Sequence, residues 1–208
     1  MEFSTPDCFS ENQSETEQRS ATRYISLIRA AKLITGVGEF VCVVRDVSQT
    51  GVKVKTFHRL PANGQPMELE LQNGERFGLR PVRQSAGEAS FSFARPVVLE
   101  RLIREHWSHP KRQFRLAVTF PVRLLTNGRS HDAQISNLSQ QGARLTTDAH
   151  FAVHQLVRIE SRDLLNLHAK VRWHRNKMYG MVFEDTFALP QIALLAAQIQ
   201  CPDLLRNA

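Results

Sequence analysis

An internal repeat constrains the fold of this chain more than any other feature of its sequence. The stretch Arg45 to Val54, RDVSQTGVKV, returns 91 positions later as Ser136 to Leu145, SNLSQQGARL. Each copy consists of an apolar run, a polar turn of the form D/N-x-S-x-x-G and a second apolar run. Self-similarity at a fixed separation predicts two copies of one small domain.

A basic cluster precedes each copy at nearly the same distance. The first cluster, RSATR, ends at Arg23, and the second, KRQFR, ends at Arg115. Arg23 stands 28 positions before Gly51, and Arg115 stands 27 positions before Gly142. The repeat therefore includes the basic cluster as well as the turn.

The length and the charge agree with two domains behind an acidic tail. Residues 1–18 contain five acidic residues, no Lys or Arg and few large apolar residues, which is typical of a disordered segment. The rest of the 208 residues divides into halves of roughly ninety to a hundred residues, each long enough for a modest core. We therefore predict a disordered tail at 1–18, one domain at 19–108 and a second at 109–208.

Alternating apolar residues predict short antiparallel strands in both halves, as at 67–71 and 116–124. Apolar residues at helical spacing follow the strands, at 97–107 in the first half and after Pro190 in the second. We expect a mainly β fold of two tandem small antiparallel barrels, each followed by a C-terminal helix that covers a mouth of its own barrel. Trp173 is expected in the core of the second barrel.

The folded part of the chain is basic and rich in arginine. The net charge is +7, and because the tail is acidic, the chain after residue 18 carries +12. Of the 27 basic residues, 21 are Arg, whose planar guanidinium can hold phosphate oxygens with two hydrogen bonds and can stack on a flat ring. This composition indicates an anionic partner, and a solvated surface that is simply rich in Arg is the alternative.

Several functions are disfavoured by what the sequence lacks. No nucleophile and base, paired carboxylates or ligands at metal-binding spacing occur, and Cys8, Cys42 and Cys201 stand far apart. We expect no enzyme activity, no catalytic residues, no metal site and no cofactor. No apolar run approaches the roughly 18 residues of a membrane span, and the N-terminus has no secretory signal. A cytoplasmic protein without membrane insertion is therefore expected.

Both halves resemble the PilZ domain, a small β-barrel receptor for the bacterial second messenger cyclic di-GMP. That family is marked by R-x-x-x-R before the first strand and by D/N-x-S-x-x-G between the second and third strands. The first half has every motif residue: Arg19, Arg23, Asp46, Ser48 and Gly51. The second half has all but the first Arg: Arg115, Asn137, Ser139 and Gly142. Lys111 stands where the pattern has that first Arg, and the segment from Lys170 to Phe183 also resembles the end of a PilZ barrel.

The chemistry of these residues suits a cyclic dinucleotide, which presents two phosphodiesters and two guanine rings. Arginine can hold phosphate oxygens or the guanine O6 and N7 atoms, and can stack on the base. Asp46 can accept from the guanine N1–H and N2–H groups, and Asn137 can accept through its amide oxygen. The serines of both turns offer a hydroxyl, and the glycines admit close approach and positive φ. The same pattern is also typical of a turn without a ligand, because Asp and Ser side chains can hydrogen-bond their own backbone.

The lysine in the second half predicts unequal sites. Lysine is a point charge without the bidentate geometry of Arg, so we expect Lys111 to weaken the second site unless Arg112 substitutes for it. We therefore predict a stronger first site and a weaker second one. Both Lys111 and Arg112 are included among the expected ligand contacts.

The resemblance implies a cyclic di-GMP receptor that passes the signal to a protein partner, in motility or exopolysaccharide machinery, through rearrangement of the two barrels. Two alternatives stay open. One is a protein-interaction adaptor that keeps the fold with little ligand affinity, and the other is a basic β-barrel that binds nucleic acid. Because nucleic-acid binding leaves the duplicated turn unexplained, no nucleic-acid partner is expected.

Overall fold

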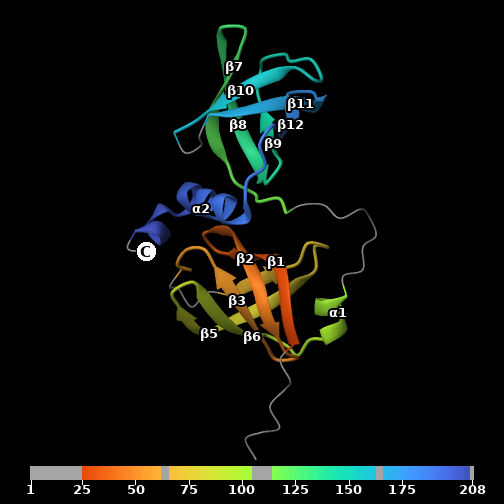
Figure 1. Ribbon diagram of the computed structural model, residues 1–208, viewed down its shortest axis with the longest axis vertical. Coiled ribbons are helices and arrows are strands. Elements are labelled where there is room, and N and C mark those ends of the chain that lie inside the picture. Colours follow the sequence, from red (N-terminus) through yellow and green to blue (C-terminus); the bar gives the residue numbers. More distant parts are fainter. Residues whose placement is uncertain (1–24, 62–65, 105–113, 163–165, 207–208) are drawn as a thin grey trace, which may run out of the picture.

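The computed structural model describes residues 25–61, 66–104, 114–162 and 166–206. They form two closed barrels of six strands each, joined end to end with a helix between them (Figure 1). The predicted mainly β fold of two small antiparallel barrels is therefore confirmed. The predicted tail at 1–18 and the predicted boundary between residues 108 and 109 lie outside the described residues.

The first barrel consists of the first six strands. They are β1 (Ile25–Thr35), β2 (Gly38–Val47), β3 (Gly51–Thr56), β4 (Met67–Glu70), β5 (Arg76–Ser85) and β6 (Glu88–Phe93). Their order around the barrel is β1-β2-β3-β6-β5-β4, and the pairing of β1 with β4 closes it. Every pair of neighbours is antiparallel.

The second barrel repeats this arrangement. Its strands are β7 (Phe120–Thr126), β8 (Arg129–Ser139), β9 (Gly142–Thr146), β10 (Leu156–Glu160), β11 (Leu167–Arg175) and β12 (Met178–Phe183). β10 closes the barrel by pairing with β7. The strand predicted at 116–124 begins only at Phe120, because Leu116 makes a single bridge to Leu138 instead of a continuous ladder.

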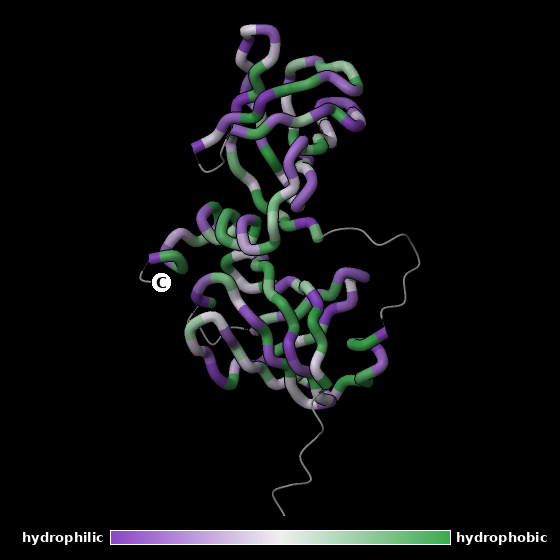
Figure 2. The backbone as a smooth tube through the Cα atoms, in the orientation of Figure 1, coloured by the Kyte–Doolittle hydropathy of each residue, from purple (hydrophilic) through white to green (hydrophobic). Residues whose placement is uncertain are grey.

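Period-two alternation places the apolar side chains inside both barrels. Figure 2 shows hydrophobic and hydrophilic residues interspersed along the strands. Trp173 is an exception, since 40% of its surface is exposed and it lies outside the second barrel. The prediction that it belongs to the core was wrong. The pairing of β11 with β12 shifts register between Val171 and Trp173, so Arg172 is an extra residue. This bulge interrupts the alternation and turns Trp173 outward.

The helix after the first barrel is shorter than expected. α1 spans Leu99–Ile103, and its C-terminal neighbour Arg104 is extended at φ −106° and ψ 95°. Leu102 is buried in the first core. The guanidinium of Arg29 on β1 donates to the carbonyl oxygens of Leu102 and Ile103, at 2.6 and 2.9 Å, and so satisfies two carbonyls at the helix end. Residues 105–107 of the predicted helix lie outside the described residues.

The helix after the second barrel contacts both barrels. α2 (Leu189–Gln200) packs Ile192, Ala193 and Ala196 into the second core. On its other side, Ala197 and the following 3-10 helix η2 (Pro202–Leu205) pack against Phe40 of β2 in the first barrel. α2 therefore covers its own barrel, as expected, and also contacts the first barrel, because apolar residues occur around most of this helix and both sides are buried.

Candidate ligand-binding site

The turn between the second and third strands has the same construction in both barrels. In β2 the register shifts between Val44 and Asp46, and in β8 it shifts between Ile135 and Asn137. Each strand thus carries one extra residue just before the Asp or Asn of the motif. Such bulges re-aim the side chains beside them, and they often occur next to binding sites.

Ser48 stabilises the turn of the first barrel. It is fully buried, and its hydroxyl oxygen accepts hydrogen bonds from the N–H groups of Thr50 and Gly51, at 3.3 and 3.0 Å. The backbone N–H of Ser48 also donates to the carbonyl of Gly51, at 2.8 Å. The hydroxyl of Ser48 therefore has partners within the turn, and the predicted ligand contact stays a prediction.

The corresponding turn of the second barrel is tied to the chain that leads into α2. The Ser139 hydroxyl donates to the carbonyl of Gly142 at 3.0 Å. The Gln140 side chain donates to the carbonyl of Phe187 at 2.9 Å, and the N–H of Phe187 donates back to the Gln140 carbonyl at 2.9 Å. These bonds fix the turn relative to the end of the barrel.

The motif glycines do not have positive φ. Among the described residues, the glycines with positive φ are Gly38, Gly74, Gly87 and Gly128. Gly51 and Gly142 are not among them, so the predicted left-handed conformation is wrong for both. Each of the two begins a strand and pairs in a ladder, which holds its backbone extended. A Cβ on Gly142 would overlap the carbonyl oxygen of Met181, so glycine is required for the approach of β12.

A pocket of about 700 Å³ lies on the outside of the second barrel. Four of the sequence-predicted residues line it: Arg115, Asn137, Ser139 and Gly142. Arg115 reaches it from the extended segment before β7, and the others come from β8, the turn and the start of β9. Arg115, the last residue of the basic cluster, and the turn are therefore together in space. Lys111 and Arg112 lie outside the described residues.

The pocket also contains residues that the sequence analysis did not assign to it, among them Arg144, Arg172, Trp173 and Gly180. Nε of Arg144 donates to the Ser136 hydroxyl at 3.3 Å. A Cβ on Gly180 would overlap the indole of Trp173, so the ring lies directly over this glycine. Within the described ranges, none of the three arginines of the pocket is in an ion pair with a carboxylate. Their guanidinium groups thus have hydrogen-bonding capacity for an anion.

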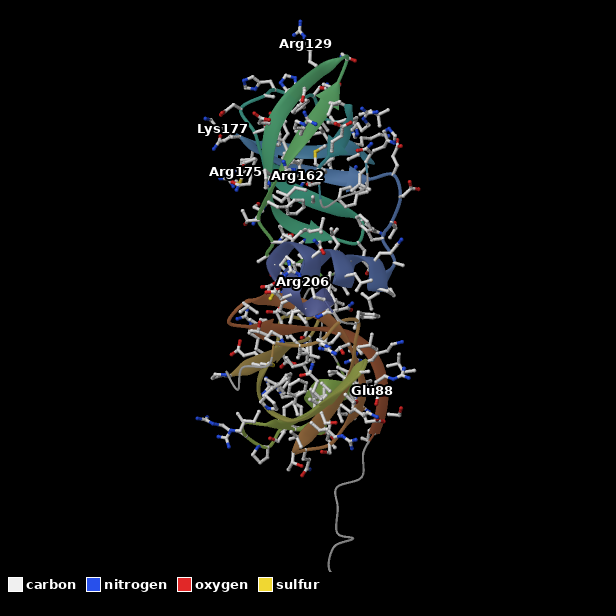
Figure 3. All side chains as sticks on the ribbon, turned by 90° about the vertical axis from the view of Figure 1, so that its left-hand side faces the viewer. Glu88, Arg129, Arg162, Arg175, Lys177 and Arg206 are labelled. Carbon is white, nitrogen blue, oxygen red and sulfur yellow. The ribbon has the colours of Figure 1, made fainter. Side chains whose placement is uncertain are left out.

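The first barrel has a smaller pocket at the equivalent place, of about 530 Å³. Asp46 and Gly51 line it, together with Lys53, Val82 and the outward side of β6. Nζ of Lys53 lies 2.8 Å from Oε2 of Glu88, and this hydrogen bond lowers the pKa of the Glu88 carboxyl. Glu88 lies on the outside of this barrel (Figure 3). Arg19 and Arg23, predicted for this site, lie outside the described residues.

Strand register shows how the two pockets differ. β5 has its own shift between Pro81 and Arg83, just as β11 has between Val171 and Trp173. Val82 is therefore the counterpart of Arg172, and Arg83 that of Trp173. At this place the second pocket is lined by an arginine and a large flat ring, whereas the first is lined by Val82 and not by Arg83.

Among the described residues, no group of three or more His, Cys, Asp or Glu could hold a metal ion. None of the helices described is long and apolar enough to span a membrane.

The family model of the PilZ domain matches residues 110–200, in the second half of the chain. This match includes all the residues that line the pocket around Arg115 and Asn137. A comparison with curated proteins found no match.

Solved structures similar to this chain include the PlzA protein of Borreliella burgdorferi in complex with c-di-GMP, at 12% identity and a TM-score of 0.34 over 86% of this chain and 93% of that chain. The Bacillus subtilis inhibitor of motility, MotI/DgrA, has 14% identity and a TM-score of 0.35, over 88% of this chain and 100% of that chain. YcgR from Escherichia coli in complex with c-di-GMP has 11% identity and a TM-score of 0.30, over 82% and 81%.

Proposed function

We propose that this protein is a receptor for cyclic di-GMP and that the pocket of the second barrel is its principal binding site. The observation that carries the proposal is the meeting of Arg115 with Asn137, Ser139 and Gly142 in one pocket within the segment that matches the PilZ domain. These residues come from two separate parts of the sequence, so their meeting depends on the fold. PlzA and YcgR are both described in complex with c-di-GMP.

The pocket offers each group that a cyclic dinucleotide requires. The guanidinium groups of Arg115, Arg144 and Arg172 can bind phosphate oxygens or the guanine O6 and N7 atoms. The amide oxygen of Asn137 can accept from the guanine N1–H or N2–H. The exposed ring of Trp173 is a surface for stacking of a base, an interaction worth about 1–3 kcal/mol.

The described residues favour the second pocket as the site of tighter binding. This order is the reverse of the one predicted from Lys111. In the first pocket the described cation, Lys53, is in an ion pair with Glu88, and Val82 takes the place of Arg172. Arg19 and Arg23 would add to the first site, so a second, weaker binding event there is part of the proposal. The first barrel is then also a PilZ-type domain, with domains at 19–108 and 109–208.

Such a receptor acts by binding and not by catalysis. We propose that it lies in the cytoplasm and passes the signal to a protein partner, in motility or exopolysaccharide machinery, through a change in the angle between the barrels. The continuous path from the Arg115 segment to the joint between the barrels supports this coupling.

Isothermal titration of cyclic di-GMP into the full chain tests the proposal. We expect saturable binding at moderate salt, and we expect Arg115→Ala to weaken it about tenfold or more, since a hydrogen bond to a charged group contributes about 1.5–3 kcal/mol. Arg23→Ala should affect the tighter of the two binding events less than Arg115→Ala does. GTP, which has the base without the cyclic diphosphate ring, should not compete at equal concentration.

Two results would contradict this assignment. Loss of binding in Arg23→Ala with no change in Arg115→Ala would make the first barrel the sensor. No heat with cyclic di-GMP in the wild type would reject the receptor, and an oligonucleotide titration at several salt concentrations would then separate a nucleic-acid barrel from an adaptor.

A further inference from the structure

The segment that carries Arg115 is bonded to its own barrel along one edge only. The N–H of Leu116 donates to the carbonyl of Leu138 at 2.8 Å, and the N–H of Leu138 donates back to the carbonyl of Leu116 at 3.0 Å. In an extended segment, the neighbouring carbonyl of Arg115 and N–H of Ala117 point to the opposite edge. These two groups need partners from elsewhere.

Both partners are side chains of the first barrel. Nζ of Lys32 on β1 donates to the carbonyl of Arg115 at 3.2 Å, and Oε2 of Glu39 on β2 accepts from the N–H of Ala117 at 2.9 Å. One donor and one acceptor thus replace the adjacent strand that the segment lacks. Lys32 and Glu39 are also bonded to each other at 3.1 Å. We name this pair the interdomain brace.

The brace is buried, and Gln200 holds Glu39 in place. Lys32 has 7% of its side chain exposed, and a second carboxylate, that of Glu70 on β4, lies 2.8 Å from its Nζ. The side chain of Gln200 on α2 accepts from the N–H of Glu39 at 2.9 Å and donates to the carbonyl of Glu39 at 2.8 Å. Gly38 makes room for this, because a Cβ there would overlap Gln200. Glu39 is therefore held by bonds that involve neither Glu70 nor the pocket.

From this geometry we infer that Lys32 and Glu39 are positioning residues for ligand binding at the second barrel. They hold the backbone of Arg115 and Ala117 so that the Arg115 side chain faces the pocket, and the first barrel thereby completes a site in the second. The inference rests on the proposed function for the identity of the ligand. It assigns to the first barrel a role that does not depend on ligand bound at its own pocket.

Glu39→Ala in the full chain tests the brace, with Glu70→Ala as its matched control. Both variants remove a carboxylate that is paired with Lys32, but only Glu39 contacts the Arg115 segment. We expect Glu39→Ala to weaken cyclic di-GMP binding about tenfold, through lost preorganisation, and Glu70→Ala to stay within about twofold. Glu39→Gln, whose amide oxygen can still accept from Ala117, should recover most of the affinity.

A double variant separates positioning from general destabilisation. If Glu39 acts through Arg115, the combined Arg115→Ala and Glu39→Ala variant binds no more weakly than Arg115→Ala alone. An effect of Glu39 that instead adds fully to that of Arg115 would overturn the inference. Equal affinity of wild type and Glu39→Ala, or equal losses in Glu39→Ala and Glu70→Ala, would also overturn it.

Amide hydrogen exchange provides a readout without ligand. The N–H of Ala117 should exchange faster in Glu39→Ala than in wild type or in Glu70→Ala. If the wild type binds no cyclic di-GMP, the proposed function fails, and unchanged exchange at Ala117 is the separate result that would reject the brace itself.

Discussion

His58 is a buried imidazole at the joint between the barrels. It follows β3, is 6% exposed, and its ring packs edge-on against that of Phe40. Nδ1 lies 2.6 Å from the carbonyl oxygen of Arg59, whereas Nε2 has no hydrogen-bond partner in the described part of the chain. Burial lowers the pKa of His58, partly offset by the backbone hydrogen bond. The ring is therefore neutral at pH 7 and resists protonation in the folded state.

This resistance predicts a loss of stability in mild acid. In the unfolded chain His58 takes up a proton as the pH falls through about 6.5, while the folded protein does so only at lower pH. Between these pKa values the unfolded state binds more protons, so the free energy of unfolding should decrease as the pH falls from 7.5 to 5.5. Urea unfolding at both pH values should show a smaller decrease in His58→Gln than in wild type. His168→Gln, at an exposed position, serves as the control and should behave as wild type does. Equal decreases in wild type and His58→Gln would refute the role of His58.

At the level of the strands, close approach of β9 and β12 depends on glycine. Gly142 pairs with Val182, and Gly180 pairs with Arg144 on the same two strands. The neighbour of Gly142 is a backbone carbonyl, that of Met181, which can move only if the strand moves with it. The neighbour of Gly180 is a side chain, the indole of Trp173. The two glycines therefore have different tolerance for a methyl group.

Gly142→Ala should accordingly destabilise the second barrel, by about 1–3 kcal/mol, as overpacking of a tightly packed site does. Gly78→Ala in β5 is the control, because the added Cβ would meet only the side-chain methyl of Ala94, at 3.2 Å. Denaturant unfolding measures both. A Gly142→Ala variant as stable as Gly78→Ala would mean that the strands separate at little cost.

Strand positions were predictable from the sequence because alternation is a local signal. The alternation at 67–71, which forms β4, belongs to this class. β10 was not predicted as a strand of its own, because the exposed Leu156 stands directly before the buried Val157. Two adjacent apolar residues obscure the alternation of Val157 with Ile159.

The candidate site was predictable only in part, because its remaining residues depend on register between distant strands. The turn motif and Arg115 stand out as repeated patterns, and they do line one pocket. Arg172 and Trp173 reach the pocket because of a bulge, and the sequence gives no sign of it, since apolar residues alternate from Leu167 to Trp173 as they would in a regular strand. The position of α2 between the barrels likewise depends on contacts about 160 residues apart in sequence, such as that of Gln200 with Glu39.

For the whole molecule, the joint between the barrels combines an apolar contact with buried polar bonds. Phe40 is fully buried against Ala197 and Leu204, and Val41 belongs to the same apolar cluster as the second core. The brace and Gln200 lie beside this contact. Directional bonds fix the angle between the barrels, and the apolar contact contributes most of the association energy.

Phe40→Ala should therefore loosen the joint while each barrel stays folded. The truncation removes a fully buried ring, a change that costs about 3–5 kcal/mol in a packed core. We expect a larger radius of gyration by small-angle scattering and two separate thermal transitions. Phe77→Ala, inside the first barrel, is the control and should lower one transition without changing the dimensions of the folded molecule. Unchanged scattering in Phe40→Ala would show that the polar bonds suffice.

The shared helix has a practical consequence for dividing the chain. A fragment that ends after the first barrel would leave Phe40 and Val41 uncovered, and a fragment of 110–208 would leave Ala197 and Leu204 uncovered. Either fragment would expose an apolar patch to solvent and would therefore self-associate at the concentrations used for expression. Residues 110–200, which match the domain family, are thus too short a segment to keep this apolar contact buried. Recombinant expression should begin with both barrels.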